Sequence, residues 1–178
     1  CYGLPGTGKT QFVEHLAASL GMPLISKRAS ELMDKYVGDN EKNIANMFEE
    51  AANEDAMLLL DEGDSFLRDR SFARAQWEVT MVNELLQHME RFPGIFVVCT
   101  NLFEGLDAAA LRRFTFKLEF NELTLNQRWE MFLNETGLRA QADKISASQK
   151  EEWWEKLAFM QLLAAGDFAT VQDRKSVV

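Results

Sequence analysis

Apolar runs that end in a polar residue recur along the first two thirds of the chain. Residues 56–61 (AMLLLD) and 94–101 (GIFVVCTN) share this pattern, which is typical of strands covered on both faces of a parallel sheet. Residues 23–26 (PLIS) predict another short buried strand. Residues 114–120 (FTFKLEF) alternate between apolar and polar positions, which predicts an edge strand.

Apolar residues at helical spacing follow in the segments between these strands. The first helix is expected to start inside a glycine-rich loop and to end near Gly21. The stripes of the three expected helices are Val13, Leu16 and Leu20; Ile44, Met47, Phe48 and Ala51; and Met81, Val82, Leu85, Leu86 and Met89. Because strands and helices alternate, we expect an α/β fold with a doubly wound parallel sheet, whose ligand sites lie at the carboxyl ends of the strands.

The pattern changes toward the end of the chain, where only helical signals remain. Thr124 with Gln127 predicts a capping box at the start of one helix, and Ser148 with Glu151 predicts a second. A third helix is expected near the C-terminus. We therefore expect an α/β domain and an all-helical domain, over residues 1–120 and 121–178.

Composition narrows the class of protein. With 178 residues, 47% apolar and 26% charged, the chain suits one globular core with an appendage. The net charge of −9 disfavours nonspecific nucleic-acid binding, which needs clustered Lys and Arg. No apolar run reaches the ~18 residues of a membrane span, and Cys1 and Cys99 make no disulfide framework. We expect a cytoplasmic protein without export or a membrane segment.

The stretch GLPGTGKT, residues 3–10, has the spacing of a phosphate-binding loop. Gly3 and Gly8 allow backbone N–H groups to surround a phosphate chain at a helix start. Lys9 would reach the β- and γ-phosphates, and Thr10 would ligate Mg²⁺. The alternative, a glycine turn that only caps a helix, is disfavoured by the apolar stripe that follows the loop.

Acidic and amide side chains follow two of the predicted buried strands. Hydrolysis needs one carboxylate for Mg²⁺ and one to polarise the attacking water, and we assign these roles to Asp61 and Glu62. Asn101, at the end of the next strand, would hydrogen-bond the same water or the γ-phosphate. Taken alone, the acidic pair and Asn101 would each more often belong to a solvated turn. The phosphate loop that precedes them in the chain favours a nucleotide-hydrolysis site instead.

Together these motifs resemble those of the AAA ATPases, a family of ring-forming ATP-driven machines. The matching segments, in order, are Walker A (GLPGTGKT), Walker B (LLLDEGD, 58–64), sensor 1 (TN, 100–101), the second region of homology (LDAAALRRF, 106–114) and the start of the last lid helix (AGDFATV, 165–171). The resemblance covers nearly the whole chain. It implies a five-stranded sheet, a C-terminal helical lid, bound ATP and Mg²⁺, and a homo-oligomer, a hexameric ring with ATP between subunits.

The resemblance also implies further nucleotide contacts. It assigns them to Pro5, Gly6, Thr7, Gly8 and Gly166. In the family, a strand and an adenine-contacting segment lie directly before Walker A. The resemblance therefore implies that the chain is truncated and begins at the last residues of that strand.

Two features depart from the family pattern. Gly63 stands where the family usually carries Ile or Ala, a change that loosens the turn and leaves both acids in place. Arg112 and Arg113 are adjacent, whereas many relatives place two arginines three residues apart as fingers for the neighbouring subunit's γ-phosphate. The resemblance favours Arg113, directly before Phe114, with Arg112 as a second or structural contact. The alternative is that both arginines pair with surface carboxylates.

Residues 35–44 (KYVGDNEKNI) carry the signal for a substrate. The Tyr-Val-Gly sequence resembles the pore loop with which protein-remodelling relatives grip an extended polypeptide. Tyr36, with Val37 beside it, would supply a stacking surface that reads no sequence. The alternative is that Tyr36 packs against its own domain.

Three functions fit these features. The first is an ATP-hydrolysing ring that remodels or unfolds proteins, favoured by Tyr36 and the acidic charge. The second is a nucleic-acid motor or loader of the wider family. The third is a nucleotide-gated scaffold with little turnover, which the intact Glu62 and Asn101 disfavour and the adjacent arginines keep open.

Overall fold

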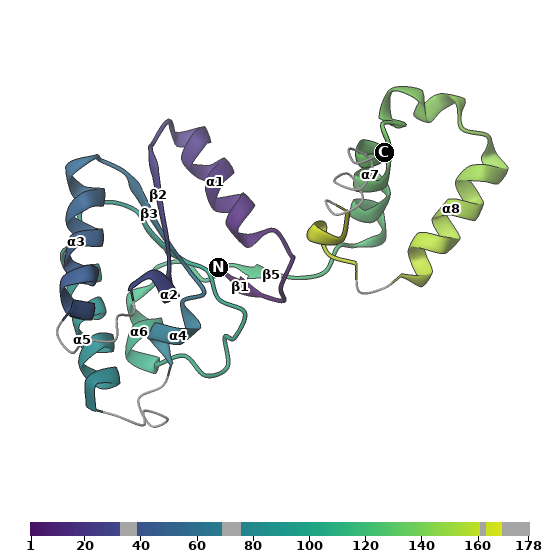
Figure 1. Ribbon diagram of the computed structural model, residues 1–178. Coiled ribbons are helices and arrows are strands. Elements are labelled where there is room, and N and C mark those ends of the chain that lie inside the picture. Colours follow the sequence, from purple (N-terminus) through teal and green to yellow (C-terminus); the bar gives the residue numbers. More distant parts are fainter. Residues whose placement is uncertain (33–38, 69–75, 161–162, 169–178) are drawn as a thin grey trace. The chain divides into compact units, whose positions relative to one another are not determined.

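The computed structural model describes residues 1–32, 39–68, 76–160 and 163–168 (Figure 1). The chain groups into two compact units. We call them the α/β unit, residues 1–3 and 9–119, and the helical unit, residues 4–8 and 120–178.

Parallel strands form the centre of the α/β unit. Strands β2 (Leu24–Arg28), β3 (Met57–Asp61) and β4 (Phe96–Val98) pair in that order, with Leu58 opposite both Ile25 and Phe96. The first four residues of β3 are fully buried. The prediction of a central strand covered on both faces is confirmed.

Two short strands form a small second sheet, which an isolated bridge links to the first. Strand β1 (Tyr2–Gly3) pairs with β5 (Glu119–Phe120), and Tyr2 also forms a parallel bridge with Thr100, just beyond β4. The amide of Thr100 donates to the carbonyl oxygen of Cys1 at 3.1 Å. Across the two sheets of the described residues, the bridge gives the order β5, β1, β4, β3, β2, so β1 lies between β5 and the end of β4.

Helix α1 (Lys9–Leu20) covers one face of the sheet. Its buried Val13 and Ala17 pack in one cluster with Met57 and Leu59 of β3. Of the predicted apolar stripe, Val13 is buried and Leu16 packs against this cluster, whereas Leu20 is 53% exposed. The helix begins at Lys9, inside the glycine-rich loop of residues 3–10, as the sequence predicts.

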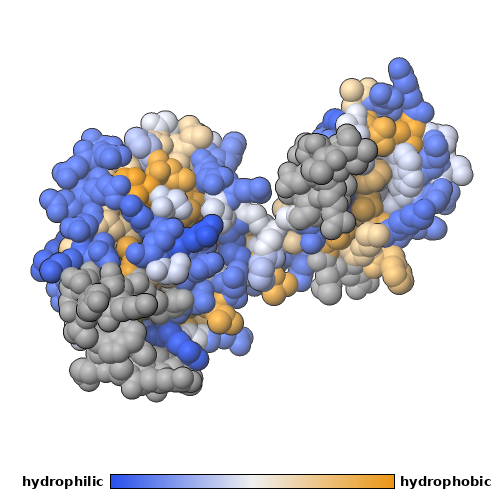
Figure 2. Space-filling view, in the orientation of Figure 1, coloured by the Kyte–Doolittle hydropathy of each residue, from blue (hydrophilic) through white to orange (hydrophobic). Residues whose placement is uncertain are grey.

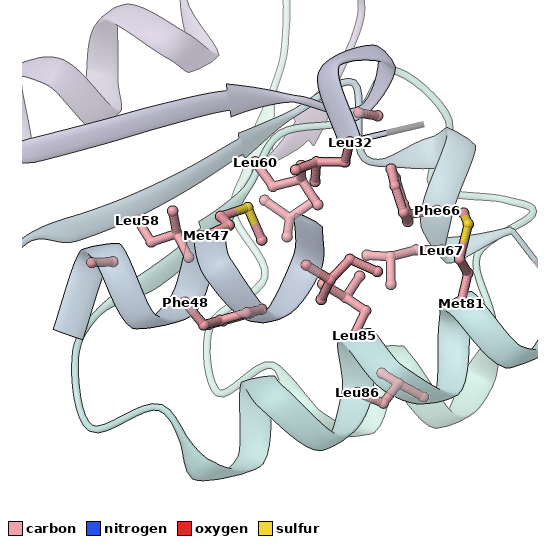
Figure 3. Packing of buried hydrophobic residues seen from close by; sticks show 14 of the residues in the cluster. Leu32, Met47, Phe48, Leu58, Leu60, Phe66, Leu67, Met81, Leu85 and Leu86 are labelled. Atoms are coloured by element: carbon pink, nitrogen blue, oxygen red, sulfur yellow. The ribbon is translucent and has the colours of Figure 1, made fainter. Parts of the chain in front are cut away.

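Helices α3 (Asp39–Asn53) and α5 (Gln76–Arg91) cover the opposite face. Leu58 and Leu60 of β3 point to this side, because successive strand residues point to opposite faces. Figure 3 shows both leucines among side chains from α3 and α5. Three short helices complete the unit: α2 (Ala29–Leu32), α4 (Asp64–Leu67) and α6 (Ala108–Arg113).

The predicted edge strand over residues 114–120 is wrong for most of its length. Only Glu119–Phe120 forms a strand, and Phe116 is 78% exposed. Alternation predicts a strand only where one face is covered. No such cover protects Phe116.

Helices α7 (Leu125–Thr136) and α8 (Ala147–Phe159), with a 3-10 helix (Arg139–Lys144) between them, form most of the helical unit. Residues 165–168 are also helical. The ring centroids of Trp129 and Trp154 lie 5.6 Å apart in its core.

The two predicted capping boxes have different outcomes. Thr124 and Gln127 cap α7 as predicted. Helix α8 is capped two residues earlier than expected, by Ser146 with Gln149. Ser146 has the extended backbone that an N-cap requires, with ψ at 151°, whereas Ser148 lies inside the helix.

A buried arginine of α7 links this helix to the end of α8 through hydrogen bonds. Arg128 of α7 is only 8% exposed, and it donates to the carbonyl oxygens of Leu123 at 2.8 Å, Leu157 at 2.7 Å and Met160 at 3.0 Å. The last two carbonyls belong to the C-terminal end of α8, where a cation is favoured by the helix dipole. Its guanidinium thus replaces lost water contacts with three backbone acceptors.

Hydrophilic residues cover most of the visible face of the α/β unit in Figure 2. Apolar residues show between them in small patches. Among the helices that the structure describes, none combines the length and the apolar character needed to cross a bilayer.

Candidate functional site

Lys9 begins α1 and is 7% exposed. Its Nζ donates to the carbonyl oxygen of Gly3 at 2.9 Å and to Oδ1 of Asn101 at 2.8 Å. Burial lowers the pKa of Lys9, while Cys99 and Asp61 act in the opposite direction. A phosphate at this position would favour the charged ammonium that burial disfavours.

Thr10 and Asp61 meet at the next position of the site. Oγ1 of Thr10, in the first turn of α1, donates to Oδ2 of Asp61, the last residue of β3, at 2.8 Å. A hydroxyl and a carboxylate oxygen are ligands that Mg²⁺ accepts, together with waters and phosphate oxygens. The two side chains therefore fit the ion that the sequence predicts here.

Glu62 has an unusual backbone conformation. Its φ is 57°, in the left-handed region, and its amide donates to Oδ1 of Asp61 at 2.9 Å. A non-glycine residue in this region costs about 1–2 kcal/mol. Such strain concentrates at functional sites, and the exposed Glu62 is the residue to which the sequence assigns water activation.

Gly63 fits a position with no room for a side chain. Its amide donates to the carbonyl oxygen of Cys99 at 2.9 Å, and an added Cβ would lie 2.3 Å from Cγ1 of Val98. Val98 is β-branched and has little rotamer freedom. We expected this glycine to loosen the turn; in the structure it permits the turn to pack closely against β4.

Thr100 and Asn101 follow β4. Thr100 is 4% exposed, and its Oγ1 donates to Oδ1 of Asp64 at 3.1 Å and accepts from the amide of Leu102 at 3.1 Å. Asn101 is exposed and is held by its contact with Lys9. The turn after β3 and the turn after β4 are thus hydrogen-bonded to each other.

The middle of the phosphate loop, residues 4–8, groups with the helical unit. Gly6 and Gly8 have φ values of 76° and 91°, which residues with a side chain rarely adopt. Oγ1 of Thr7 donates to the carbonyl oxygen of Leu4 at 2.8 Å, and Pro5 is exposed. The loop backbone therefore has the conformation that its glycines allow.

Gly166 contacts this part of the loop. Its amide donates to the carbonyl oxygen of Gly6 at 2.7 Å. An added Cβ on Gly166 would lie 3.1 Å from that oxygen, closer than nine in ten real Cβ contacts. Two of the predicted nucleotide-contacting residues therefore lie against each other in the helical unit.

The two arginines at the end of α6 differ in their surroundings. Nε of Arg113 donates to Oε1 of Glu90 at 2.6 Å, and its Nη1 donates to the carbonyl oxygen of Ala109 at 2.9 Å. Arg112 is exposed and forms no ion pair with the residues that the structure describes. Arg113 thus has a carboxylate partner in its own chain, which is the alternative left open for it by the sequence.

The residues predicted to contact a substrate belong to a different segment of the chain. Tyr36 and Val37 lie outside the described residues. Their assignment to a pore loop stays a prediction.

Four of the predicted residues meet at the carboxyl ends of neighbouring strands: Lys9 with Asn101, and Thr10 with Asp61. The structure does not bring Arg113 to them. This convergence is what the pattern of apolar runs ending in polar residues led us to expect.

Sequence reasoning missed the link between Thr100 and Asp64. Both residues lie inside the recognised motifs, Thr100 directly before Asn101 and Asp64 two residues after Glu62. Their polar side chains beside the assigned residues were the available signal. Only the structure shows that the two side chains meet.

Comparison with known proteins agrees with this geometry. Residues 1–122 match the family described as the ATPase family associated with various cellular activities (AAA). An uncharacterized AAA family ATPase of Sinorhizobium fredii is 37% identical over 122 residues, which are 67% of this chain and 37% of that protein. Spastin of Drosophila melanogaster is 33% identical over 141 residues, 75% of this chain and 18% of that protein.

An uncharacterized protein of Acidianus two-tailed virus is 34% identical over 134 residues, 67% of this chain and 25% of that protein. The chain thus spans less than two fifths of the length of each of these relatives. The family match covers more than half of the chain and includes every site residue of the α/β unit. The chain therefore belongs to the AAA family of ATPases.

Proposed function

We propose that the chain is the ATP-binding and ATP-hydrolysing module of a ring-forming machine that remodels or unfolds proteins. The observation that carries the proposal is the pair of 2.8 Å contacts, Lys9 with Asn101 and Thr10 with Asp61. They place a cation, a hydroxyl, a carboxylate and an amide at neighbouring strand ends. Phosphoryl transfer to water uses this set of groups.

Each residue has a role in hydrolysis. Lys9 binds the β- and γ-phosphates, and Thr10 and Asp61 hold Mg²⁺, which when bound neutralises charge on the phosphates. Glu62 accepts a proton from the attacking water. Asn101 donates from its amide nitrogen to that water or to the γ-phosphate.

The helical unit serves as the lid in this proposal. Gly6, Thr7 and Gly8 surround the phosphates with backbone N–H groups; Pro5, which has no N–H, lies beside them in the loop, and Gly166 lies against Gly6. The hydrogen bond between Gly166 and Gly6 supports a role for the lid near the phosphate loop.

The arginine pair acts across a subunit interface in the proposed hexameric ring. Arg113 must leave Glu90 to reach a neighbouring γ-phosphate, and exposed ion pairs of this kind contribute only about 0–1 kcal/mol. A finger that accelerates hydrolysis by ~10³–10⁵ lowers the barrier by about 4–7 kcal/mol. The gain exceeds the cost of releasing Arg113, and Arg112 is available as a second contact.

The proposed substrate is an extended polypeptide gripped by Tyr36 and Val37 in a central pore. The net charge of −9 supports a protein substrate over DNA or RNA. Two free cysteines, one of them fully buried, suit the reducing cytoplasm, where we place the protein.

ATP turnover measured with and without an unfolded polypeptide, and separately with single-stranded and duplex DNA, tests this function. Polypeptide should stimulate hydrolysis, and Tyr36→Ala should remove the stimulation while leaving basal hydrolysis intact. Stimulation by DNA alone would favour a nucleic-acid motor. Absence of MgATP binding would contradict the proposal altogether.

A nucleotide-gated scaffold is the second candidate, favoured by the ion pair between Arg113 and Glu90. If Arg113 stays bound to Glu90 in the ring, turnover is slow and ATP acts as an assembly signal. Sedimentation with ATP and with ADP, run beside a turnover assay, separates the two. ATP-dependent assembly without hydrolysis would support the scaffold.

A further inference from the structure

We propose that the hydrogen bond between Thr100 and Asp64 fixes the spacing between Glu62 and Asn101, so that Thr100 and Asp64 are positioning residues for hydrolysis. The inference rests on the proposed function, because it concerns the geometry of the same reaction. Neither residue has a role in the site as assigned from the sequence. Both belong to the α/β unit.

The two proposed reacting residues lie on separate turns. Glu62 belongs to the turn after β3, and Asn101 belongs to the turn after β4. The strand pairing between β3 and β4 ends at Leu60 and Val98, before either residue is reached. Other contacts must therefore set the distance between the turns.

Two hydrogen bonds join the turns beyond the paired strands. The amide of Gly63 donates to the carbonyl oxygen of Cys99 at 2.9 Å, and the hydroxyl of Thr100 lies 3.1 Å from Oδ1 of Asp64. The first joins two backbone groups, and no side-chain atom takes part in it. The second depends on side chains, so it is the contact that the sequence specifies.

The position of Thr100 favours a rigid link. Thr100 is 4% exposed, and its Oγ1 accepts from the amide of Leu102 at 3.1 Å while its own amide donates to Cys1. Asn101 lies between Thr100 and Leu102 and is held by this small ring of contacts. Fixing the hydroxyl therefore fixes the backbone that carries Asn101.

The hydroxyl has one proton and two acceptors within reach. Oδ1 of Asp64 is at 3.1 Å, and the carbonyl oxygen of Leu102 is at 3.3 Å. A carboxylate accepts a stronger hydrogen bond than a neutral carbonyl, so the proton is directed to Asp64. Removing the charge of Asp64 weakens this preference and lets the hydroxyl turn to Leu102.

Small errors in spacing are costly in catalysis. A displacement of about 1 Å between reacting groups lowers turnover by ~10²-fold, whereas ground-state binding changes little. Glu62 is already held in a left-handed conformation, with φ at 57°, which a loosened turn would relax. Loss of the link should therefore lower kcat and leave nucleotide affinity unchanged.

Thr100→Val and Asp64→Asn test the inference in the protein with MgATP as substrate. Valine keeps the shape of threonine without its hydroxyl, and asparagine keeps the shape of aspartate without its charge. We expect kcat to fall about 10- to 100-fold in Thr100→Val and by a smaller factor in Asp64→Asn, with KM and the Kd for a fluorescent ATP analogue within about twofold of the parent. Thr100→Ser, which restores the hydroxyl, should recover most of the turnover.

Matched controls remove the same groups from the surface. Thr115→Val and Glu104→Gln change exposed residues and should leave kcat unchanged. The double variant Thr100→Val with Asp64→Asn should lose no more turnover than Thr100→Val alone, because both changes break one link.

The inference is overturned if the parent hydrolyses ATP and both Thr100→Val and Asp64→Asn keep the parent's kcat. It is also overturned if the fold-loss of kcat in the double variant equals the product of the two single losses. It is also overturned if kcat falls only as far as the folded fraction does in thermal unfolding. Should Thr100→Val not fold, the kcat of Asp64→Asn decides by the same criteria, and Thr100→Ser, which keeps the hydroxyl, should keep most of the turnover. A parent that binds no MgATP, or never turns it over, contradicts the proposed function instead.

Discussion

Nζ of Lys9 lies 2.8 Å from Oδ1 of Asn101. A lysine ammonium only donates hydrogen bonds, so this contact assigns the oxygen of the Asn101 amide to Lys9. The NH₂ group of Asn101 is then left for a second partner that accepts. A water molecule or a phosphate oxygen meets that requirement.

Lys9→Ala should abolish nucleotide binding. The variant removes the only lysine of the phosphate loop, whose burial disfavours its charge until a phosphate arrives. Titration with a fluorescent ATP analogue measures the effect. Lys144→Ala, which changes an exposed lysine of the helical unit, is the control and should bind as the parent does. Unchanged affinity in Lys9→Ala would remove Lys9 from the site.

Glu62→Gln should bind MgATP and hydrolyse it slowly. Loss of a positioned general base lowers turnover by ~10²–10⁴-fold, because the amide cannot accept the proton of water. Glutamine has the same shape and the same left-handed strain, so the free energy of unfolding should not change. The variant should also trap assembled rings. Near-normal turnover would move the role of base to another residue.

Arg113→Ala should lose turnover in a way that a neighbouring subunit restores. Mixing it with Glu62→Gln subunits re-forms interfaces that pair an intact Arg113 with an intact Glu62, so some activity should return. Arg112→Ala, tested alongside, decides between the adjacent arginines. Glu90→Gln is a further comparison, because it frees Arg113 without removing it. If Arg113→Ala is silent and activity is independent of protein concentration, the ring mechanism is wrong.

Gly63→Ala should destabilise the α/β unit by about 1–3 kcal/mol, as forced overpacking does. The added methyl group would lie 2.3 Å from Cγ1 of Val98, which belongs to the central sheet. Urea unfolding measures the change. Gly105→Ala is the matched control, since nothing lies within 4 Å of its added Cβ. The double variant Gly63→Ala with Val98→Ala should lose less unfolding free energy than the sum of the losses in the two single variants. Strictly additive losses would contradict the contact.

Cys99 should make stability fall at high pH. Burial raises the pKa of this thiol from 9.0 to about 11. The folded protein therefore keeps the thiol protonated while the unfolded chain ionises, and the free energy of unfolding drops as pH rises from about 9 to about 11. The loss amounts to about 2–3 kcal/mol.

Comparison with Cys99→Ala isolates this effect. The pKa of Lys9 is lowered by burial, so Lys9 contributes a trend of opposite sign in the same range. The difference between the unfolding curves of parent and variant, followed from pH 7 upward, removes the part of that trend that does not depend on Cys99. Curves that stay parallel above pH 9 would mean that Cys99 ionises equally in both states.

The elements of the α/β unit were predictable where burial dictates the pattern. Met57 through Leu60 form an unbroken apolar run because both faces of this strand are covered. Such a run by itself predicts a buried strand. Residues 114–120 show the limit of the same reasoning. Their alternation resembles a strand, yet strand formation needs a partner and a covering layer that local sequence does not encode.

The sequence predicts which residues belong to the candidate site, but it does not predict their contacts. Strand ends and the phosphate loop identified Lys9, Asp61 and Asn101, because parallel strands bring their carboxyl ends to one edge. The left-handed backbone of Glu62 leaves no mark in the sequence, since any residue type can be forced there by its surroundings. Arg128 is a similar case, a charged residue that only tertiary packing buries.

The position of β1 between β5 and the end of β4 has a consequence for how the protein is made. Residues 1–3 are synthesised before the rest of the α/β unit, yet their hydrogen-bonding partners are Thr100 and Leu118. Strands β2, β3 and β4 are closer neighbours along the chain, and contacts of short sequence separation close with less loss of chain entropy. On the ribosome, the phosphate loop is therefore anchored only after Thr100 has left the exit tunnel, so a nascent chain gains most of its α/β core before it can hold a nucleotide.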